Sequence, residues 1–167
     1  KYIRHLSQDI AEMERLVEVL LNYARLEQSL IKVDKVPVDL NQLLDQCVYG
    51  LDDADGKLIK WQPIDKITIV GDQNFLAMLI NNLLNNAQQY ASQIIQVSIV
   101  QKSQSIELVV EDDGLGIDKS KRLKLLQPFT RGHNDIEKPG FGMGLAIVAR
   151  IAAWHNAEIR IAESELE

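Results

Sequence analysis

The first 28 residues contain neither glycine nor proline, and apolar residues recur among them at alternating spacings of three and four. This spacing predicts one long helix with an apolar seam of the kind that packs against a partner helix. Leu16 and Leu21 widen the seam, which favours a helical bundle over a two-stranded coiled coil. The alternative is a single amphipathic helix that lies on its own domain. The seam consists of Ile3, Leu6, Ile10, Met13, Val17, Leu20 and Ala24.

After this helix the chain alternates between extended and helical patterns. An extended connector or edge strand is expected around Pro37. Asp39 and Gln42 have the spacing of a capping box, so a helix should begin there and end near Gly50. Asp72 is expected to cap a longer helix. The other predicted elements are strands at 57–64 and 66–70, the capped helix at 73–91, hairpin strands at 94–101 and 105–113, a buried helix at 144–155 and a strand at 157–164.

This order of elements predicts an α+β fold with helices on one face of a mixed or mostly antiparallel sheet, preceded by the long bundle helix. The 167 residues are enough for one compact domain plus an appendage. We therefore expect residues 1–30 to form the helical appendage and residues 31–167 to form the compact domain.

Charge and composition exclude several classes of protein. The net charge of −6 repels nucleic acid, and it also opposes the binding of a nucleotide triphosphate unless local donors outweigh it. Cys47 is the only cysteine, so it cannot form an internal disulfide and is expected to serve in packing. No apolar stretch approaches the roughly 18 residues of a membrane span. The sequence does not begin with Met, and we expect it to be part of a longer protein.

Polar side chains recur on one face of the predicted helix at 73–91. Asn82 and Asn86 are four residues apart and therefore share a face, which Gln89 and Tyr90 continue. Asparagine lowers helix propensity, and no local gain offsets that loss here. An amide oxygen can ligate a hard cation such as Mg²⁺. A solvated polar face is the alternative, and we expect it for the neighbouring asparagines 81 and 85.

Two glycine-rich segments end or begin regular elements. In the segment "VEDDGLGID", Asp112 ends a strand and is followed by Gly114 and Gly116, so a carboxylate there can accept a hydrogen bond while the backbone turns beneath a flat ring. An ordinary turn is the alternative. The segment "GFGMGLAIV", residues 140–148, leads into an apolar helix. Its backbone amides can approach a ligand closely, which favours an anion at the helix N-terminus, although a tightly packed loop would look the same.

The stretch between residues 118 and 140 is polar and irregular. It contains "QPFTRG", in which Phe129 is expected to be an apolar anchor and Arg131 offers a permanently charged fork suited to phosphate. Long irregular segments between ordered elements are commonly functional, often as lids. An exposed loop is the alternative.

These four segments, in this order and spacing, resemble the nucleotide-binding domain of bacterial sensor histidine kinases. "NLLNNAQQY" resembles the N box of that family, "DDGLG" the G1 box, "QPFTR" the F box and "GFGMGLAIV" the G2 box. The resemblance covers about residues 37–163, and it implies a two-layer α/β sandwich of the Bergerat ATP-binding type. The first helix, ending in "LLNYARLE", resembles the C-terminal helix of the family's dimerisation and phosphotransfer hairpin, with wording closest to the RstB-type sensors.

The resemblance also implies roles for single residues. Asn86 would coordinate Mg²⁺ together with the triphosphate, Asn82 would assist on the same face, and Asp112 would accept a hydrogen bond from the adenine amine. The remaining implied ATP contacts are Tyr90, Gly114, Gly116, Ile117, Phe129, Arg131, Gly140, Gly142, Gly144 and Leu145. The implied cofactors are thus ATP and Mg²⁺, with the segment 118–140 as the ATP lid.

The sequence departs from the family pattern at three places. Gln89 stands where many members have Lys or Arg, which removes one phosphate contact and predicts a modest affinity for ATP. Leu126 replaces the first Phe of the F box, which is a tolerable apolar change. The final strand expected after "AESELE" is missing from the sequence.

None of the three histidines matches the family's phosphoacceptor. His5 is followed by "LSQDI" rather than by the acidic, basic, hydroxyl and proline pattern of the acceptor, so we expect it to be a solvated helix residue. His133 is expected on the lid surface and His155 at a helix end. The acceptor histidine would therefore lie upstream of this chain, which on its own should bind ATP without phosphorylating itself.

The resemblance leaves two other functions to be weighed. ATPases of the gyrase type share the fold but place a Glu four residues before the Mg²⁺ ligand, where this chain has Asn82, and an amide is no general base. A degenerate module that binds nucleotide weakly and mediates dimerisation or docking is the second alternative, which Gln89 favours. As partners, the resemblance implies a homodimer through the helical hairpin and the receiver domain of a response regulator, with no nucleic acid. It places the chain in the cytoplasmic portion of a bacterial inner-membrane protein.

Overall fold

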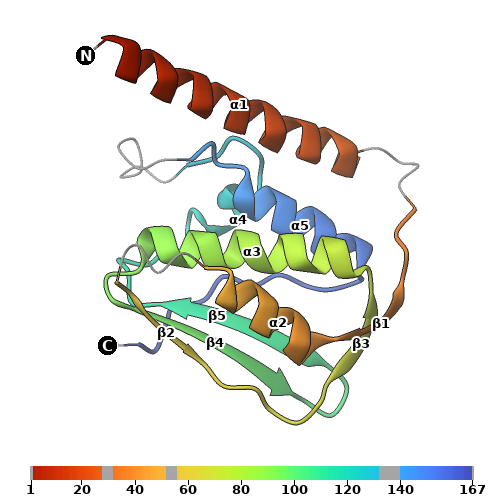
Figure 1. Cartoon of the computed structure of the whole chain (residues 1–167). Helices are drawn as coiled ribbons and strands as arrows, with labels where there is room; N and C mark the ends of the chain where they lie inside the picture. The colour runs from red at the N-terminus through yellow and green to blue at the C-terminus, as the bar shows by residue number, and fades with distance from the viewer. Residues whose placement is uncertain (1, 28–31, 52–55, 132–139, 167) are drawn as a thin grey trace.

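The computed structural model describes the chain except for residues 1, 28–31, 52–55, 132–139 and 167, and except for the side chains of residues 2–9, 12 and 15. Figure 1 shows the helices stacked above the sheets, with the first helix outermost. The elements are α1 (Tyr2–Glu27), β1 (Val36–Asp39), α2 (Leu40–Tyr49), β2 (Leu58–Trp61), β3 (Thr68–Gly71), α3 (Gln73–Tyr90), β4 (Ile94–Gln101), β5 (Ile106–Asp112), α4 (Arg122–Leu125) and α5 (Gly144–Trp154).

The strands form two small sheets. In the larger one the order is β2–β4–β5, with β2 parallel to β4 and β4 antiparallel to β5. The smaller one pairs β1 with β3 in antiparallel fashion, so that Pro37 lies opposite Val70. The predicted α+β fold with a mixed sheet is confirmed, and the hairpin around residues 102–105 is as expected. The separation into two sheets was not predicted.

Alternation along β4 determines which face of the larger sheet is covered. Ile95, Val97 and Ile99 are buried, whereas the residues between them are half-buried. These three side chains belong to a core cluster that also contains Leu44 of α2 and Leu84 of α3, both fully buried. The helices therefore lie on one face of the sheet, as the sequence predicts (Figure 1).

The predicted helix caps are confirmed. The Asp39 carboxylate accepts a hydrogen bond from the Gln42 backbone N–H at 3.2 Å, and α2 ends at the cap Gly50. The buried carboxylate of Asp72 accepts from the N–H groups of Asn74 and Phe75 at 3.0 and 3.2 Å. Short polar side chains thus satisfy amides that have no partner within the helix, which is why both helices begin where the sequence indicates.

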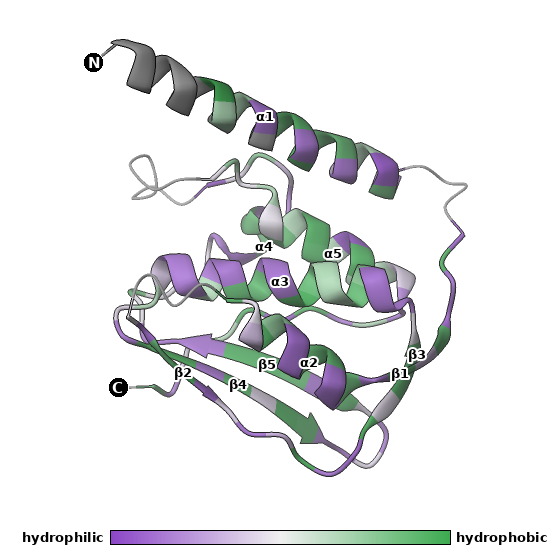
Figure 2. Cartoon of the chain, viewed as in Figure 1, coloured by the Kyte–Doolittle hydropathy of each residue, from purple (hydrophilic) through white to green (hydrophobic). Residues whose placement is uncertain are grey.

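The C-terminal end of α1 docks on α5. Leu26 is 1% exposed and lies in a cluster with Met143, Ile147 and Ile151. The Arg150 side chain on α5 reinforces the contact, because its Nε donates to the Leu26 carbonyl at 3.1 Å. Figure 2 shows α5 as an almost continuously apolar helix beneath α1. The last turns of α1 therefore lie on the domain, as in the alternative of a helix packed on its own domain, while the bundle stays a prediction.

The predicted seam of α1 is not what docks. Ile10, Met13 and Val17 are 50%, 67% and 52% exposed, whereas the contacts to α5 come from a different stripe that includes Val19 and Leu26. The seam residues Ile3 and Leu6 lie outside the described side chains. None of the described helices is both long and apolar enough to cross a membrane.

We predict that Leu26→Ala lowers the free energy of unfolding by about 2–4 kcal/mol, because it opens a cavity between α1 and α5. Leu21→Ala is the matched control, since this leucine lies on the same helix and is 54% exposed, and its effect should stay within about 0.5 kcal/mol. Urea denaturation followed by circular dichroism measures both. Equal losses for the two variants would contradict the docked position of Leu26.

The strand predicted at 157–164 is not observed, and that prediction is wrong for this structure. Residues 157–166 form neither a strand nor a helix. Beyond the Ala157 N–H, which donates to the Ala152 carbonyl at 2.9 Å, side chains bind this segment to the domain. The Ile161 carbonyl accepts from Arg122 at 3.1 Å, and the Glu165 N–H donates to the Glu111 carboxylate at 3.4 Å. The alternation of apolar residues in this segment is therefore not sufficient to make it a strand of the sheet beside β5.

Candidate functional site

The C-terminal half of α3 presents the first group of candidate residues. Asn82 and Asn86 are half-buried, while Asn81 and Asn85 are exposed, which is the division that the sequence predicts. The Asn82 side-chain amide donates to the Met78 carbonyl one turn earlier at 2.8 Å. Its Oδ1 faces the start of α5, because a Cβ built on Gly144 would lie 3.3 Å from it. The asparagine face of α3 and the N-terminus of α5 are therefore adjacent.

The turn after β5 packs under the end of α3. The Asp112 carboxylate accepts from the Gly114 N–H at 2.9 Å. A Cβ at Gly114 would lie 2.4 Å from the Tyr90 carbonyl oxygen and 2.6 Å from Asp112 Oδ1. Only a glycine fits this close approach. The structure thus places Asp112, Gly114 and Tyr90 together, with Gly116 following at a φ of 70°.

Two other carboxylates flank this turn and have different roles. The backbone amides of Ile94, Gln93 and Ser92, the first contributing most, lower the pKa of Asp113, so its charge holds the start of β4. A side-chain hydrogen bond from Ser120, joined by that residue's backbone N–H, lowers the pKa of Asp118. Both groups are occupied in local structure, and Asp112 is the carboxylate beside α3.

The second glycine segment forms the entry to α5, which begins at Gly144 as predicted. The N-cap residue Met143 makes no side-chain hydrogen bond to the first turn, and the first amides of any helix have no partner within the helix itself. Gly142 has a φ of 67°, and a Cβ there would lie 2.6 Å from the Thr130 carbonyl oxygen. A Cβ at Gly140 would be 3.8 Å from the Gln89 side chain. The glycine segment therefore contacts both α3 and the segment around Thr130.

The segment at 126–131 is brought to the glycine loop, but the expected anchor is not buried. Phe129 has a φ of 60° and is 62% exposed, so the prediction of an apolar anchor is wrong here. The positive φ turns the backbone at this point and leaves the ring outside the core. Arg131 is exposed, and its Cγ lies 3.0 Å from a Cβ built on Gly142. Residues 132–139, with His133, lie outside the described residues.

Four segments that are far apart in the sequence therefore meet around the end of α3 and the start of α5. They bring together amide oxygens, one carboxylate and the N-terminus of α5, whose N-cap residue makes no side-chain hydrogen bond to it. Ile117 and Leu145 are half-buried at the two glycine turns. Among the described residues, no group of three or more His, Cys, Asp and Glu side chains is placed to hold a metal ion. The arrangement suits an anionic ligand that carries its own cation.

Sequence reasoning missed the structural role of His155. Its Nε2 accepts from the backbone N–H of Asp72 at 3.0 Å, so Nδ1 carries the proton that is donated to the Ile151 carbonyl at 2.8 Å. A Cβ on Gly71 would lie 2.9 Å from the imidazole. The ring therefore joins the end of α5 to the start of α3. No local sequence signal indicates this contact, because 83 residues separate the two partners.

The chain is similar to known proteins over the residues that form this site. Residues 71–167 match the family described as histidine kinase-, DNA gyrase B- and HSP90-like ATPases. The chain is 28% identical to the signal transduction histidine-protein kinase BaeS of Escherichia coli, over 97% of the chain and 36% of BaeS. It is 30% identical to the sensor protein RstB of the same organism, over 96% of the chain and 38% of RstB. The chain spans less than two fifths of the length of these relatives.

Solved structures agree with this similarity. Full-length ShkA in complex with AMPPNP superposes with a TM-score of 0.76 at 26% identity, covering 91% of this chain and 33% of ShkA. The mycobacterial sensor histidine kinase MprB superposes with a TM-score of 0.64 at 26% identity, covering 73% of this chain and 80% of that one.

Proposed function

This chain belongs to the histidine kinase-, DNA gyrase B- and HSP90-like ATPase family as the ATP-binding catalytic part of a sensor histidine kinase, and we propose that it presents Mg²⁺–ATP to a histidine outside the chain. The observation that carries the proposal is the meeting of four segments at the end of α3 and the start of α5. When bound, Mg²⁺–ATP supplies the γ-phosphoryl group for such a transfer, in which positioning and charge neutralisation dominate.

The base end of the nucleotide would lie at the turn after β5. Asp112 Oδ1 already accepts from the Gly114 amide, and a carboxylate has further lone pairs with which to accept from the adenine amine. Tyr90, Gly116 and Ile117 would border the ring. Close approach at Gly114 supports this placement, because the backbone there leaves no room for a side chain.

The phosphate end would lie between α3 and α5. Asn86 would ligate Mg²⁺ through Oδ1, with Asn82 beside it and phosphate and water oxygens as the other ligands, which suits the absence of an acidic metal cluster in the described part of the chain. The amides around Gly140, Gly142, Gly144 and Leu145 would donate to phosphate oxygens. Phe129 and Arg131 would approach from the segment beside the glycine loop.

The negative net charge of the chain indicates that the helix N-terminus, Mg²⁺ and Arg131 must act together to bind a triphosphate. A helix N-terminus stabilises an anion by about 0.3–2 kcal/mol. This is little against a chain with a net charge of −6. Mg²⁺ and the permanent charge of Arg131 would therefore provide most of the charge balance.

Two alternatives remain distinguishable. Water activation in the gyrase manner would need a general base at position 82, where the amide of Asn82 already donates to the Met78 carbonyl. A degenerate module with weak nucleotide binding is favoured by Gln89, because many family members have Lys or Arg at this position. The Gln89 side chain lies beside Gly140. Measured affinity separates this module from a working kinase domain.

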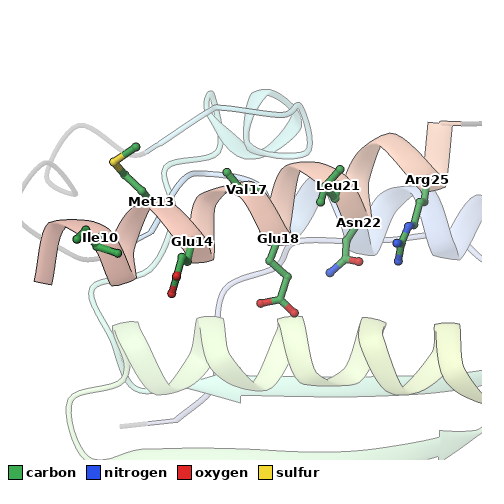
Figure 3. A pocket seen from close by; sticks show the side chains of 8 residues that line it. All are labelled: Ile10, Met13, Glu14, Val17, Glu18, Leu21, Asn22 and Arg25. Carbon is green, nitrogen blue, oxygen red and sulfur yellow. The ribbon is translucent and has the colours of Figure 1, made fainter. Parts of the chain in front are cut away.

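The exposed face of α1 supports a helical partner. Figure 3 shows Met13, Val17 and Leu21 pointing to the side of α1 away from α3, with Glu14 and Glu18 on the opposite side. An apolar stripe of this kind is stabilised when another helix covers it. We expect the other helix of a dimerising hairpin to pack on this face of the helical region 1–30. A receiver domain of a response regulator would then accept the phosphoryl group from the histidine. From the similarity to sensor histidine kinases we also propose a position on the cytoplasmic side of a bacterial inner membrane.

Two measurements on the purified chain test the function. Calorimetric titration with ATP should give measurable affinity that rises when Mg²⁺ is added. Incubation with γ-labelled ATP should leave the chain itself without acid-labile label, while a separately supplied hairpin bearing the acceptor histidine becomes labelled. ATP affinity with no response to Mg²⁺ favours the degenerate module, and rapid release of phosphate favours the ATPase.

A further inference from the structure

We propose that Arg122 is a positioning residue that fixes the turn beside Asp112 by tying it to the C-terminal segment, an inference that rests on the proposed nucleotide site. Arg122 is the first residue of α4, and its side chain is 17% exposed, unlike the exposed lysines on either side of it. A guanidinium that is largely removed from water needs partners for its donors.

The guanidinium joins two backbone segments that are 44 residues apart. Its Nε donates to the carbonyl of Ile117 and its Nη1 to the carbonyl of Ile161, both at 3.1 Å. Nη2 lies 3.5 Å from Glu163 Oε1, which also pairs with Lys119 at 3.2 Å. The carboxylate is 71% exposed, so these ion pairs add little stability. The two carbonyl contacts are the ones that hold the segments.

The contact between Arg122 and the Ile117 carbonyl restrains the turn after β5, because Ile117 lies at the end of that turn. Ile117 directly follows Gly116, whose φ of 70° reverses the chain two residues after Gly114. Gly114 in turn contacts the Asp112 carboxylate and the Tyr90 carbonyl. Holding the Ile117 carbonyl therefore restrains the far end of the turn that would border the adenine ring. The segment around Ile161 lies beside α4 and lines a groove with it, and the Glu165 N–H holds the same segment to the Glu111 carboxylate at 3.4 Å.

Arginine is suited to this bridge and lysine is not. A planar guanidinium presents several donors in fixed, separate directions, so it can bind two carbonyls on different segments at once. A lysine ammonium is a single point, and it can keep the charge and one of the two contacts. The role is therefore predicted to depend on the shape of the side chain more than on its charge.

Binding of adenosine, ADP and Mg²⁺–ATP to the purified chain tests this role, at a temperature where every variant is folded by circular dichroism. Arg122→Ala should weaken all three ligands by the same factor, about three- to tenfold, because they share the adenine end. Arg122→Lys should lose less affinity for these ligands than Arg122→Ala does. Lys124→Ala is the matched control, a cation exposed on the same short helix, and it should change affinity by less than about 1.5-fold.

An Arg122→Ala variant that is folded and binds adenosine like the wild type overturns the inference, as does an equal loss in the control. Should the wild type bind no nucleotide, the proposed function is wrong, and hydrogen exchange then decides on Arg122 alone. Faster exchange at residues 114–118 in Arg122→Ala, with the control unchanged, supports the restraint of the turn. Unchanged exchange rates overturn it.

Discussion

Replacing Asn86 with Ala is expected to weaken the binding of Mg²⁺–ATP by about 10–100-fold, while the affinity for adenosine stays nearly constant. The amide oxygen of Asn86 is the proposed protein ligand of the metal, and the described residues provide no acidic cluster that could replace it. Adenosine has no phosphates, so its binding does not depend on the cation. Titration of each ligand with and without Mg²⁺ measures the effect.

Asn85→Ala is the matched control for this experiment. Asn85 is the same residue type one position earlier on α3, but its side chain is exposed, whereas Asn86 is half-buried. The control variant should bind Mg²⁺–ATP within about twofold of the wild type. Equal losses in both variants would show a general effect on the helix and would sink the assignment of Asn86 as the metal ligand.

Gly114→Ala is expected to have the second large effect, on stability and on binding together. A methyl group there would lie 2.4 Å from the Tyr90 carbonyl oxygen and 2.6 Å from Asp112 Oδ1, so backbone must move. We expect the free energy of unfolding to fall by about 1–3 kcal/mol. Because the displaced groups are those proposed to border the adenine ring, affinity for adenosine should fall about tenfold or more in the folded variant.

Gly116→Ala separates crowding from backbone conformation. Gly116 has a φ of 70°, but a Cβ there would meet no atom within 4 Å. Gly116→Ala should therefore lower the free energy of unfolding only by the cost of a positive φ for alanine, about 1–2 kcal/mol. Urea denaturation and adenosine titration on both variants make the comparison. A Gly114→Ala variant no more impaired in adenosine binding than Gly116→Ala would contradict the proposed contact between this turn and the base.

Much of the fold could be predicted because its signals are local. Asp39 and Asp72 marked the starts of α2 and α3, since a capping side chain must lie within a few residues of the amides that it satisfies. The division between Asn82 or Asn86 and their exposed neighbours followed from helical periodicity. The order of strands around the hairpin also follows from short spacing along the chain.

Other features depend on partners that are distant in sequence. The strand expected at 157–164 lacks a ladder, because apolar alternation specifies a face but not which strand edge is available. Phe129 is exposed, since a positive φ turns the chain there, and no residue type other than glycine signals such a conformation reliably.

The sequence by itself determined the helices α1, α2, α3 and α5, the caps of α2 and α3, the mixed α+β architecture and the residue types of the candidate site, because each is encoded in spacings of a few residues. The short helix α4 was not predicted, because the stretch 118–140 was expected to be irregular. Only the tertiary structure decided that Leu26 rather than the predicted seam docks α1, that His155 joins α5 to Asp72, and that Arg122 joins Ile117 to Ile161. Apart from Arg122 and Ile117, which are five positions apart, the hydrogen-bonded partners in these contacts are 39 to 124 positions apart. Their geometry exists only once the core has packed and brought the partners within hydrogen-bonding distance.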